Sequence, residues 1–391
     1  MSSPLHIGLV ALEGAGWMGG VAYIRNLAKA IRLADPNARV SIVCAEPLRT
    51  FWQHDSPLIS VPVDQPRGPR RFLPPYVPKV RDILRANAVD FLYPLTYENQ
   101  HTLGIQLPVA RQLDGCCWAG WVPDFQHRYL PHFFSKQEID WRERTIAILA
   151  REAPRLILSS ESAKTDFARF YPASADKSEV LHFATAPEDD WYDRTVELSC
   201  VKDSERFLLI SNQFWAHKNH LLVFEALHLL GQKGVHPKVV CTGNLEDSRD
   251  GSYAIEVRDT LRDYGFSEQV KLLGLVPRRE QIELMRRALA VIQPSLFEGW
   301  STVVEDARVL GRPCLLSDLP VHLEQNPPGA RFFPRDSATA LAELITEAWT
   351  NNRPGPDGEA EAAARVAGGK ALANVGTRFL ELAGRLCRSG T

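Results

Sequence analysis

The chain has 391 residues and a mass of 43.8 kDa, which is long enough for two domains that each bury a core. Its 45 basic and 47 acidic residues leave a formal charge of −2, so no global positive charge favours nucleic-acid binding. Hydrophobic residues make up 45% and charged residues 24%, which excludes a chain that is disordered throughout.

The first half of the chain alternates between predicted strands and predicted helices. An apolar run at 6–10, a glycine-rich turn and helical periodicity at 21–32 predict a strand, a loop and a helix. Further strands are predicted at 40–44, 91–95, 117–122 and 155–160, and further helices at 78–86, 135–152 and 161–171. This alternation favours a parallel sheet that is covered by helices on both faces.

The second half repeats this pattern after a change of composition. Residues 184–206 are acidic and lack an apolar period, so they are the linker candidate. Strands are predicted at 207–211, 238–243, 270–274, 289–293 and 313–317, and one long helix at 357–388. We therefore expect an α/β fold with domains at 1–190 and 200–370 and a C-terminal helix, 371–391, that packs back on the first domain.

Membrane spans and disulfides are not expected from the sequence. The longest charge-free stretches, 1–12 and 99–110, are shorter than the ~18 apolar residues of a membrane helix. The N-terminus lacks the positive region of a secretory signal, and we expect a cytoplasmic protein. The seven cysteines have no C-x-x-C spacing, so we expect thiols rather than a disulfide framework or a metal site.

The most informative segment is QPSLFEGWSTVVEDARVLGRPCLLS at 293–317. It predicts a strand that ends at Pro294, a loop around Glu298 and a helix that starts near Thr302. Free N–H groups at a helix N-terminus attract phosphate, and Gly299 lets a ligand approach the backbone. Two interpretations of Glu305 stay open here: a ligand contact, or a capping box in the T-x-x-E spacing from Thr302.

This segment resembles the signature of the retaining, nucleotide-sugar-dependent glycosyltransferases of family four, the group 1 type. Members of that family have the GT-B architecture, with two Rossmann-like doubly wound lobes and an interlobe cleft. The resemblance implies that Glu298 touches the donor sugar, that the amides of Gly299, Trp300 and Ser301 hold the diphosphate, and that Glu305 binds the ribose. Six residues separate the two glutamates here, whereas the family pattern has seven.

The segment SNQFWAHKNH at 211–220 resembles the phosphate-binding arginine and lysine of the same family. Lys218 fits the lysine, and Asn219 lies beside it in the expected donor site. Gln213 stands where the arginine is expected. An amide can bind phosphate but adds no charge, so Lys218 would carry more of the leaving-group stabilisation. The alternative is a solvated lysine at the start of a helix.

Two further matches extend the resemblance to the donor site. GAGWMGGVAYIRNLAKAI at 14–31 is similar to the first-lobe loop and helix, which implies that Gly19 and Gly20 face the donor phosphates. A tight strand-to-helix turn is the alternative for these glycines. KLLGLVP at 271–277 resembles the region whose backbone binds the nucleobase, which makes Leu275 and Val276 candidates.

On the acceptor side, WVPDFQH at 121–127 corresponds to the histidine-aspartate pair of many relatives. Pro123 stands where that histidine would be, and Asp124 is retained. Asp124 or His127 could orient the acceptor hydroxyl or lie near the transferred sugar. His127 and His132 could equally be ordinary loop histidines.

The sequence contains no D-x-D, so the metal-bridged diphosphate site of the other large glycosyltransferase fold has no anchor. We expect no metal and no cofactor, with a nucleoside diphosphate sugar as the donor substrate. A basic segment around FLPPYVP either contacts anionic lipid on the inner face of the cell membrane or is a solvated loop. Its basic residues are Arg67, Arg70, Arg71, Lys79, Arg81 and Arg85.

The function that the resemblance implies is retaining, metal-independent hexosyl transfer to a hydroxyl acceptor, such as a lipid-linked saccharide, in bacterial polysaccharide or glycolipid biosynthesis. Because Gln213 and Pro123 depart from the family pattern, a second interpretation stays open: a scaffold or partner subunit that binds a nucleotide sugar without turnover. A sugar-nucleotide epimerase of the same architecture is a third alternative.

Overall fold

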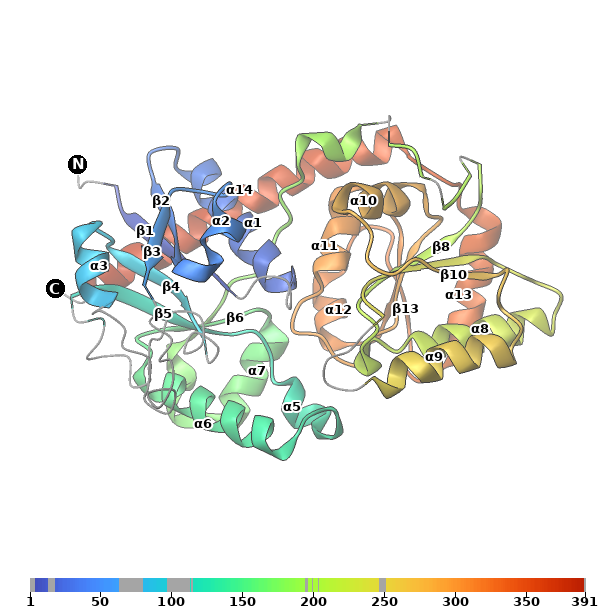
Figure 1. The fold of residues 1–391 in the computed structure, drawn as a ribbon, viewed down its shortest axis with the longest axis horizontal. Helices are drawn as coiled ribbons and strands as arrows, with labels where there is room; N and C mark the ends of the chain where they lie inside the picture. The colour runs from blue at the N-terminus through green and yellow to red at the C-terminus, as the bar shows by residue number, and fades with distance from the viewer. Residues whose placement is uncertain are drawn as a thin grey trace. The chain divides into compact units, whose positions relative to one another are not determined.

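The computed structural model describes residues 4–12, 18–62, 80–96, 113, 115–193, 196–198, 200–202, 204–245 and 251–389. The chain divides into two compact units. The first unit comprises Met1–Arg128, Ser135–Ala186 and Lys370–Thr391, and the second comprises Tyr129–Phe134 and Pro187–Gly369. Each unit contains one parallel sheet with helices on its faces (Figure 1).

The sheet of the first unit has the strand order β3-β2-β1-β4-β5-β6-β7, and every pairing in it is parallel. Strands β1 and β4 are buried along their whole length, as is typical of strands covered on both faces. The strands are β1 His6–Val10, β2 Arg39–Ala45, β3 Leu58–Val61, β4 Phe91–Leu95, β5 Cys117–Val122, β6 Leu156–Leu158 and β7 Ser178–Val180.

The helices of the first unit pack on both faces because side chains alternate along each strand. Ile42 and its neighbour Val43 in β2 point into different core clusters, one with α1 and α14 and the other with α3, α6 and α7. A Cβ on Gly376 of α14 would lie 2.0 Å from the carbonyl oxygen of Ala30 in α1, so this contact requires glycine. The helices are α1 Met18–Ala34, α2 Arg49–Trp52, α3 Val80–Ala86, α5 Gln126–Tyr129, α6 Lys136–Glu152, α7 Glu161–Phe170 and α14 Gly358–Ser389, which begins in the second unit.

The sheet of the second unit has the order β10-β9-β8-β11-β12-β13, again entirely parallel. From β8 the chain proceeds outward through β9 and β10, and from β11 it proceeds in the opposite direction. The topological switch point therefore lies between β8 and β11, where ligands bind in open α/β sheets. The strands are β8 Leu208–Ser211, β9 Val239–Thr242, β10 Val270–Leu272, β11 Val291–Gln293, β12 Cys314–Ser317 and β13 Arg331–Phe333.

The faces of this second sheet are also covered separately (Figure 1). Leu208 packs in a core cluster with α8, α9 and α13, whereas Leu209 packs in a cluster with α10 and α11. The helices are α8 His220–Gly231, α9 Ser252–Asp263, α10 Arg278–Arg287, α11 Thr302–Val309, α12 Pro320–Gln325 and α13 Ala338–Asn351.

The structure differs from the sequence predictions in two respects. Strands β3, β7 and β13 were not predicted, and each lies at an edge of its sheet. The linker candidate at 184–206 is partly built into the second unit, because Trp191, Leu198 and Val201 are buried in the core of that unit. Most of the basic segment lies outside the described residues, and Arg81 and Arg85 belong to α3.

No helix in the described ranges is both long and apolar enough to cross a membrane.

Candidate functional site

The predicted donor-site residues that belong to the second unit follow strands at the carboxyl edge of its sheet. Lys218 follows β8, Leu275 follows β10, and Glu298 follows β11. Because carboxyl ends of parallel strands meet at one edge, residues far apart in sequence come together there. Lys218 and Glu298, 80 residues apart, form a direct ion pair.

One oxygen of the Glu298 carboxylate is held by three donors. Oε1 accepts hydrogen bonds from Lys218 Nζ at 2.6 Å, from Gln293 Nε2 at 2.8 Å and from Ser295 Oγ at 2.7 Å. Among the described residues, no hydrogen bond reaches the other oxygen, Oε2. The carboxylate is therefore fixed in orientation while one oxygen stays available to a ligand hydroxyl.

The ion pair is largely removed from water, since the side chains of Lys218 and Glu298 are only 13% and 9% exposed. Burial alone would raise the pKa of Glu298. The charge of Lys218, assisted by His217 and His322, outweighs burial and lowers this pKa to about 2. Glu298 is thus an anion at every physiological pH.

The position of Lys218 is set by the turn that precedes α8. Residues Ala216–Lys218 form a short 3-10 helix, and Asn219 follows in the left-handed region with φ 56°. The Asn219 amide donates to the carbonyl oxygens of Pro294 and Arg335, both at 3.3 Å. Asn219, which we expected in the donor site, therefore ties the β8 turn to the loops after β11 and β13.

Gln213 contacts the neighbouring loop. Its Oε1 accepts from the backbone N–H of Asn244 at 2.7 Å. The two loops approach so closely that a Cβ on Gly243, where φ is 131°, would lie 1.9 Å from the carbonyl oxygen of Asn212. The residue that replaces the expected arginine thus has a structural contact that connects the ends of β8 and β9.

The helix α11 begins at Thr302, as predicted, but its N-cap is not the residue considered in the sequence analysis. Ser301 is the N-cap, and its side chain accepts from the backbone N–H of Val304. The capping box that we considered between Thr302 and Glu305 is therefore wrong. The Ser301 N–H donates to Gln325 Oε1 at 3.2 Å. Ser301 is one of the three residues whose amides are expected to hold a diphosphate, and its amide already has this hydrogen-bond partner.

Glu305 is buried in the first turn of α11. Its carboxylate accepts from Arg308 Nε at 3.0 Å and from Gln325 Nε2 at 3.0 Å. Burial raises the pKa of Glu305, and these two donors only partly offset burial. Sequence reasoning missed Gln325, because nothing local to α12 marks it as a neighbour of α11.

The nucleobase candidates Leu275 and Val276 lie in the loop between β10 and α10. Leu275 is 69% exposed, so its side chain offers an apolar surface to a ligand. Gly19 and Gly20 lie in the first turn of α1, in the first unit.

The acceptor-side candidates belong to the first unit. Asp124 is partly buried, and its Oδ1 accepts from the backbone N–H of Gln126 at 2.9 Å, which fixes the start of α5. His127 is only 1% exposed, and its Nε2 contacts Glu143 of α6 at 2.9 Å. Burial lowers the pKa of His127 despite this contact. His127 is therefore an interior residue on α5, whereas His132 is exposed.

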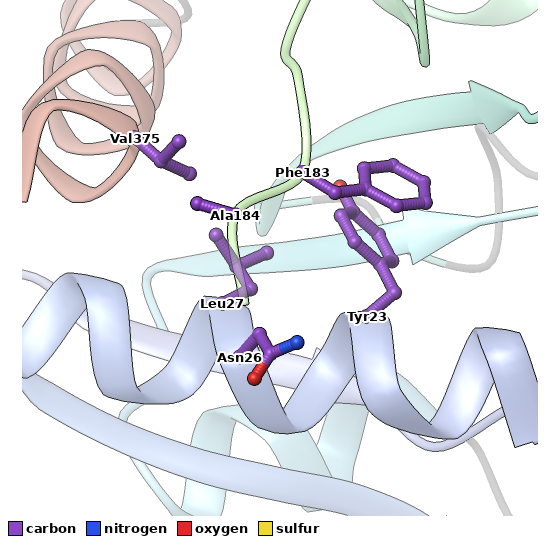
Figure 2. Close-up of a pocket in the computed structure, with 6 residues that line it drawn as sticks. All are labelled: Tyr23, Asn26, Leu27, Phe183, Ala184 and Val375. Carbon is purple, nitrogen blue, oxygen red and sulfur yellow. The ribbon is translucent and has the colours of Figure 1, made fainter. Parts of the chain in front are cut away.

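Figure 2 shows a separate small pocket in the first unit between α1, the segment after β7 and α14. The Tyr23 ring stacks on Phe183 at 4.3 Å, and Asn26 Oδ1 accepts from the backbone N–H of Ala186. Its six lining residues include no charged side chain. This pocket therefore offers a phosphate no cationic donor. The lining residues are Tyr23, Asn26, Leu27, Phe183, Ala184 and Val375.

Comparison with known sequences connects the second unit to one enzyme family. Residues 199–365 match the family model described as "Glycosyl transferases group 1". "Putative glycosyltransferase EpsF" of Bacillus subtilis (strain 168) is 30% identical over 106 residues, which are 27% of this chain and 26% of that protein. "O-antigen chain mannosyltransferase RfbU" of Salmonella typhimurium is 22% identical over 224 residues, 57% of this chain and 58% of the relative. The matched part of the chain thus spans about a quarter of the length of EpsF and just over half of the length of RfbU.

Solved structures show the fold over nearly the whole chain. Anabaena Alr3699/HepE, in complex with UDP and glucose, superposes with a TM-score of 0.71 at 17% identity, covering 98% of this chain and 100% of that one. Sucrose-phosphate synthase from Thermosynechococcus elongatus gives 0.63 at 17% identity, covering 98% of each chain. The α/β fold of GT-B type is therefore confirmed, and within it residues 199–365 match the glycosyl transferases group 1 model.

Proposed function

We propose that this protein is a glycosyltransferase that moves a sugar from a nucleoside diphosphate sugar to a hydroxyl acceptor. The ion-paired Lys218 and Glu298 at the switch point of the second sheet carry the proposal. The family match over residues 199–365 and the named activities of the relatives support it.

Lys218 and the start of α11 are the proposed diphosphate site. Cleavage of the bond between sugar and phosphate leaves positive charge on the sugar ring and negative charge on the diphosphate. The Lys218 ammonium has three N–H donors, of which one contacts Glu298, so the others can face phosphate oxygens. The Gly299 amide and the first turn of α11 would add N–H donors and the positive end of a helix dipole.

Glu298 is the proposed contact to the donor sugar, and Glu305 the proposed contact to its ribose. Glu298 Oε2 is an anionic acceptor whose orientation is fixed through Oε1, which suits a sugar hydroxyl. Glu305 is fixed through both oxygens, Oε1 by Gln325 and Oε2 by Arg308. Preorganised acceptors of this kind favour one donor geometry over others.

We further propose that transfer proceeds with retention and without a metal ion. The acceptor hydroxyl would attack the anomeric carbon from the face that the phosphate leaves. The departing phosphate oxygen would take the hydroxyl proton, so no protein nucleophile is required. Lys218 and the backbone amides would then stabilise the charge on the leaving group. On the acceptor side, partly buried Asp124 is better placed than the interior His127 to meet a hydroxyl.

The relatives suggest which substrates to test first. HepE has been solved with UDP and with UDP-glucose, and RfbU is named as a mannosyltransferase of the O-antigen chain. We propose a hexose donor and a saccharide acceptor of the kind used in bacterial polysaccharide synthesis. More specifically, we propose that the acceptor is lipid-linked and that the basic segment contacts the membrane surface.

A nucleotide screen followed by an activity assay tests this function. One of UDP, GDP, ADP and dTDP should raise the melting temperature, because it binds only the native state. The corresponding sugar nucleotide should then be consumed in the presence of a saccharide acceptor. Lys218→Ala should lower transfer by about two orders of magnitude, and Lys233→Ala, an exposed lysine after α8, should not.

The alternatives give different outcomes in the same assays. A scaffold, which the structural contact of Gln213 favours, would bind the sugar nucleotide without consuming it. An epimerase would convert the donor with no acceptor present. Absence of a melting shift with all four nucleotides would contradict the donor site itself.

A further inference from the structure

The last residue of α12, Gln325, contacts the loop and helix that form the proposed donor site. Its Oε1 accepts from the Ser301 N–H at 3.2 Å, and its Nε2 donates to the Ser301 carbonyl oxygen and to Glu305 Oε1, both at 3.0 Å. The Gln325 side chain is buried. Arg308 of α11 donates to the Gln325 main-chain carbonyl and, at 3.0 Å, to Glu305 Oε2. These bonds close a ring between the start of α11 and the end of α12.

The chemistry of the partners fixes the orientation of the Gln325 amide. Its NH2 group meets two acceptors, the Ser301 carbonyl and the Glu305 carboxylate, while its oxygen meets a donor. A flipped amide would lose all three hydrogen bonds. The position therefore requires one donor group and one acceptor group, which glutamine supplies and glutamate does not.

We propose that Gln325 is a positioning residue that holds Glu305 and the N-terminus of α11 in the geometry that binds the nucleoside diphosphate part of the donor. This inference rests on the proposed function, because it assigns Glu305 to the ribose. Gln325 itself touches no ligand; it acts through Glu305 and Ser301.

The electrostatics of Glu305 explain why such a residue is needed. Burial favours the neutral acid, whereas a carboxylate that accepts two ribose hydroxyls must be an anion. The donors that favour the anion are Arg308 and the Gln325 amide. The other titratable neighbours are Asp306 on α11, which opposes ionisation, and Cys314 on β12, whose pKa burial raises to about 12.

The substitution Gln325→Glu tests the proposal because it preserves the shape of the side chain and replaces its NH2 donor by an oxygen acceptor. At pH 8 the new carboxylate faces Glu305 across the 3.0 Å contact, so the donor is lost and two like charges repel. At pH 6 the coupled pair can share a proton, which restores an O–H donor toward Glu305. The nucleotide affinity of this variant should therefore depend on pH in a way that the wild type does not.

The measurement is isothermal titration calorimetry at pH 6 and pH 8, with whichever of UDP, GDP, ADP and dTDP binds the wild type. For Gln325→Glu we expect a Kd raised roughly ten- to a hundredfold at pH 8, with partial recovery at pH 6. Gln325→Met should weaken binding at both values without recovery. The matched control is Gln232→Glu, the same change at an exposed position after α8.

Two results would overturn the inference. The first is wild-type affinity in both folded Gln325 variants, with folding verified by their thermal unfolding. The second is a loss in Gln325→Glu that is equal at pH 6 and pH 8, which would indicate a packing role only. A wild-type protein that binds none of the four nucleotides would refute the proposed function and this inference with it.

Discussion

Removal of the Lys218 ammonium should destabilise the protein because it leaves a buried carboxylate unpaired. The change Lys218→Met keeps the aliphatic stem and deletes the group that lies 2.6 Å from Glu298 Oε1. Gln293 and Ser295 would still donate to that oxygen, but neither carries charge. The effect should appear in unfolding experiments that require no substrate.

The magnitude follows from the pKa of Glu298. This pKa is lowered from 4.5 to about 2, and each pKa unit corresponds to about 1.4 kcal/mol. The carboxylate thus contributes about 3 kcal/mol above pH 4.5, and the contribution is lost as the pH falls toward 2. Breaking a buried pair by removing one partner costs a similar amount, about 3 to 5 kcal/mol. We expect Lys218→Met to lose about 3 kcal/mol of unfolding free energy at pH 7.

Denaturant unfolding of a double-mutant cycle is the assay. Adding Glu298→Gln to Lys218→Met should recover most of the loss, because a neutral amide needs no cation. The deficit of Lys218→Met should shrink as the pH falls from 4.5 to 2, because Glu298 of the variant takes up a proton in this range while Glu298 of the wild type stays ionised until about pH 2. Lys136→Met, which breaks an exposed i,i+4 pair with Asp140, should cost no more than about 0.5 kcal/mol.

The reasoning is refuted if Lys218→Met matches Lys136→Met in stability at pH 7. It is refuted equally if Glu298→Gln and Lys218→Met are additive, since two residues in direct contact should couple.

Two further predictions concern residues beside this site. Neither ring nitrogen of buried His220 has a hydrogen-bond partner in the described part of the chain, and burial lowers its pKa to about 3. Between pH 6.5 and pH 3 the His220 imidazole binds a proton in the unfolded chain but not in the folded protein, so the wild type loses stability as the pH falls. The stability of His220→Phe relative to the wild type should therefore rise by about 1.4 kcal/mol per pH unit over this range, measured by urea titration. Equal pH dependence of the two proteins would contradict this prediction. Ser301→Ala should cost about 1 kcal/mol by loss of the N-cap, whereas Thr302→Ala should stay within about 0.5 kcal/mol, and thermal unfolding that shows the reverse order would restore Thr302 as the cap.

The predicted strands include all those that lie inside the sheets, together with the edge strand β10. Strands such as FLYPL are buried on both faces, so their sequence is a continuous apolar run. The three unpredicted strands are edge strands of three or four residues. They include Ser60, Glu179 and Arg331, which break the apolar run because an edge strand is less covered.

The local motifs predicted which loops carry Lys218 and Glu298, because each residue follows a recognisable strand. Their ion pair, however, depends on the order of β8 and β11 in the sheet, which no local pattern contains. The same reason explains why Gln325 was missed. The capping box considered at Thr302 was one residue late, because serine and threonine at adjacent positions are both suitable N-caps.

The path of α14 has a practical consequence for dissecting the protein. Residues from Lys370 onward complete the first unit, where Phe379 is fully buried against the rings of Phe91 and Tyr93. The first unit is therefore encoded by separated stretches of the gene. An expression fragment that stops near residue 190 would expose this aromatic surface and invite aggregation. To obtain the first half alone, residues 370–389 would have to be attached to its end through a designed connection.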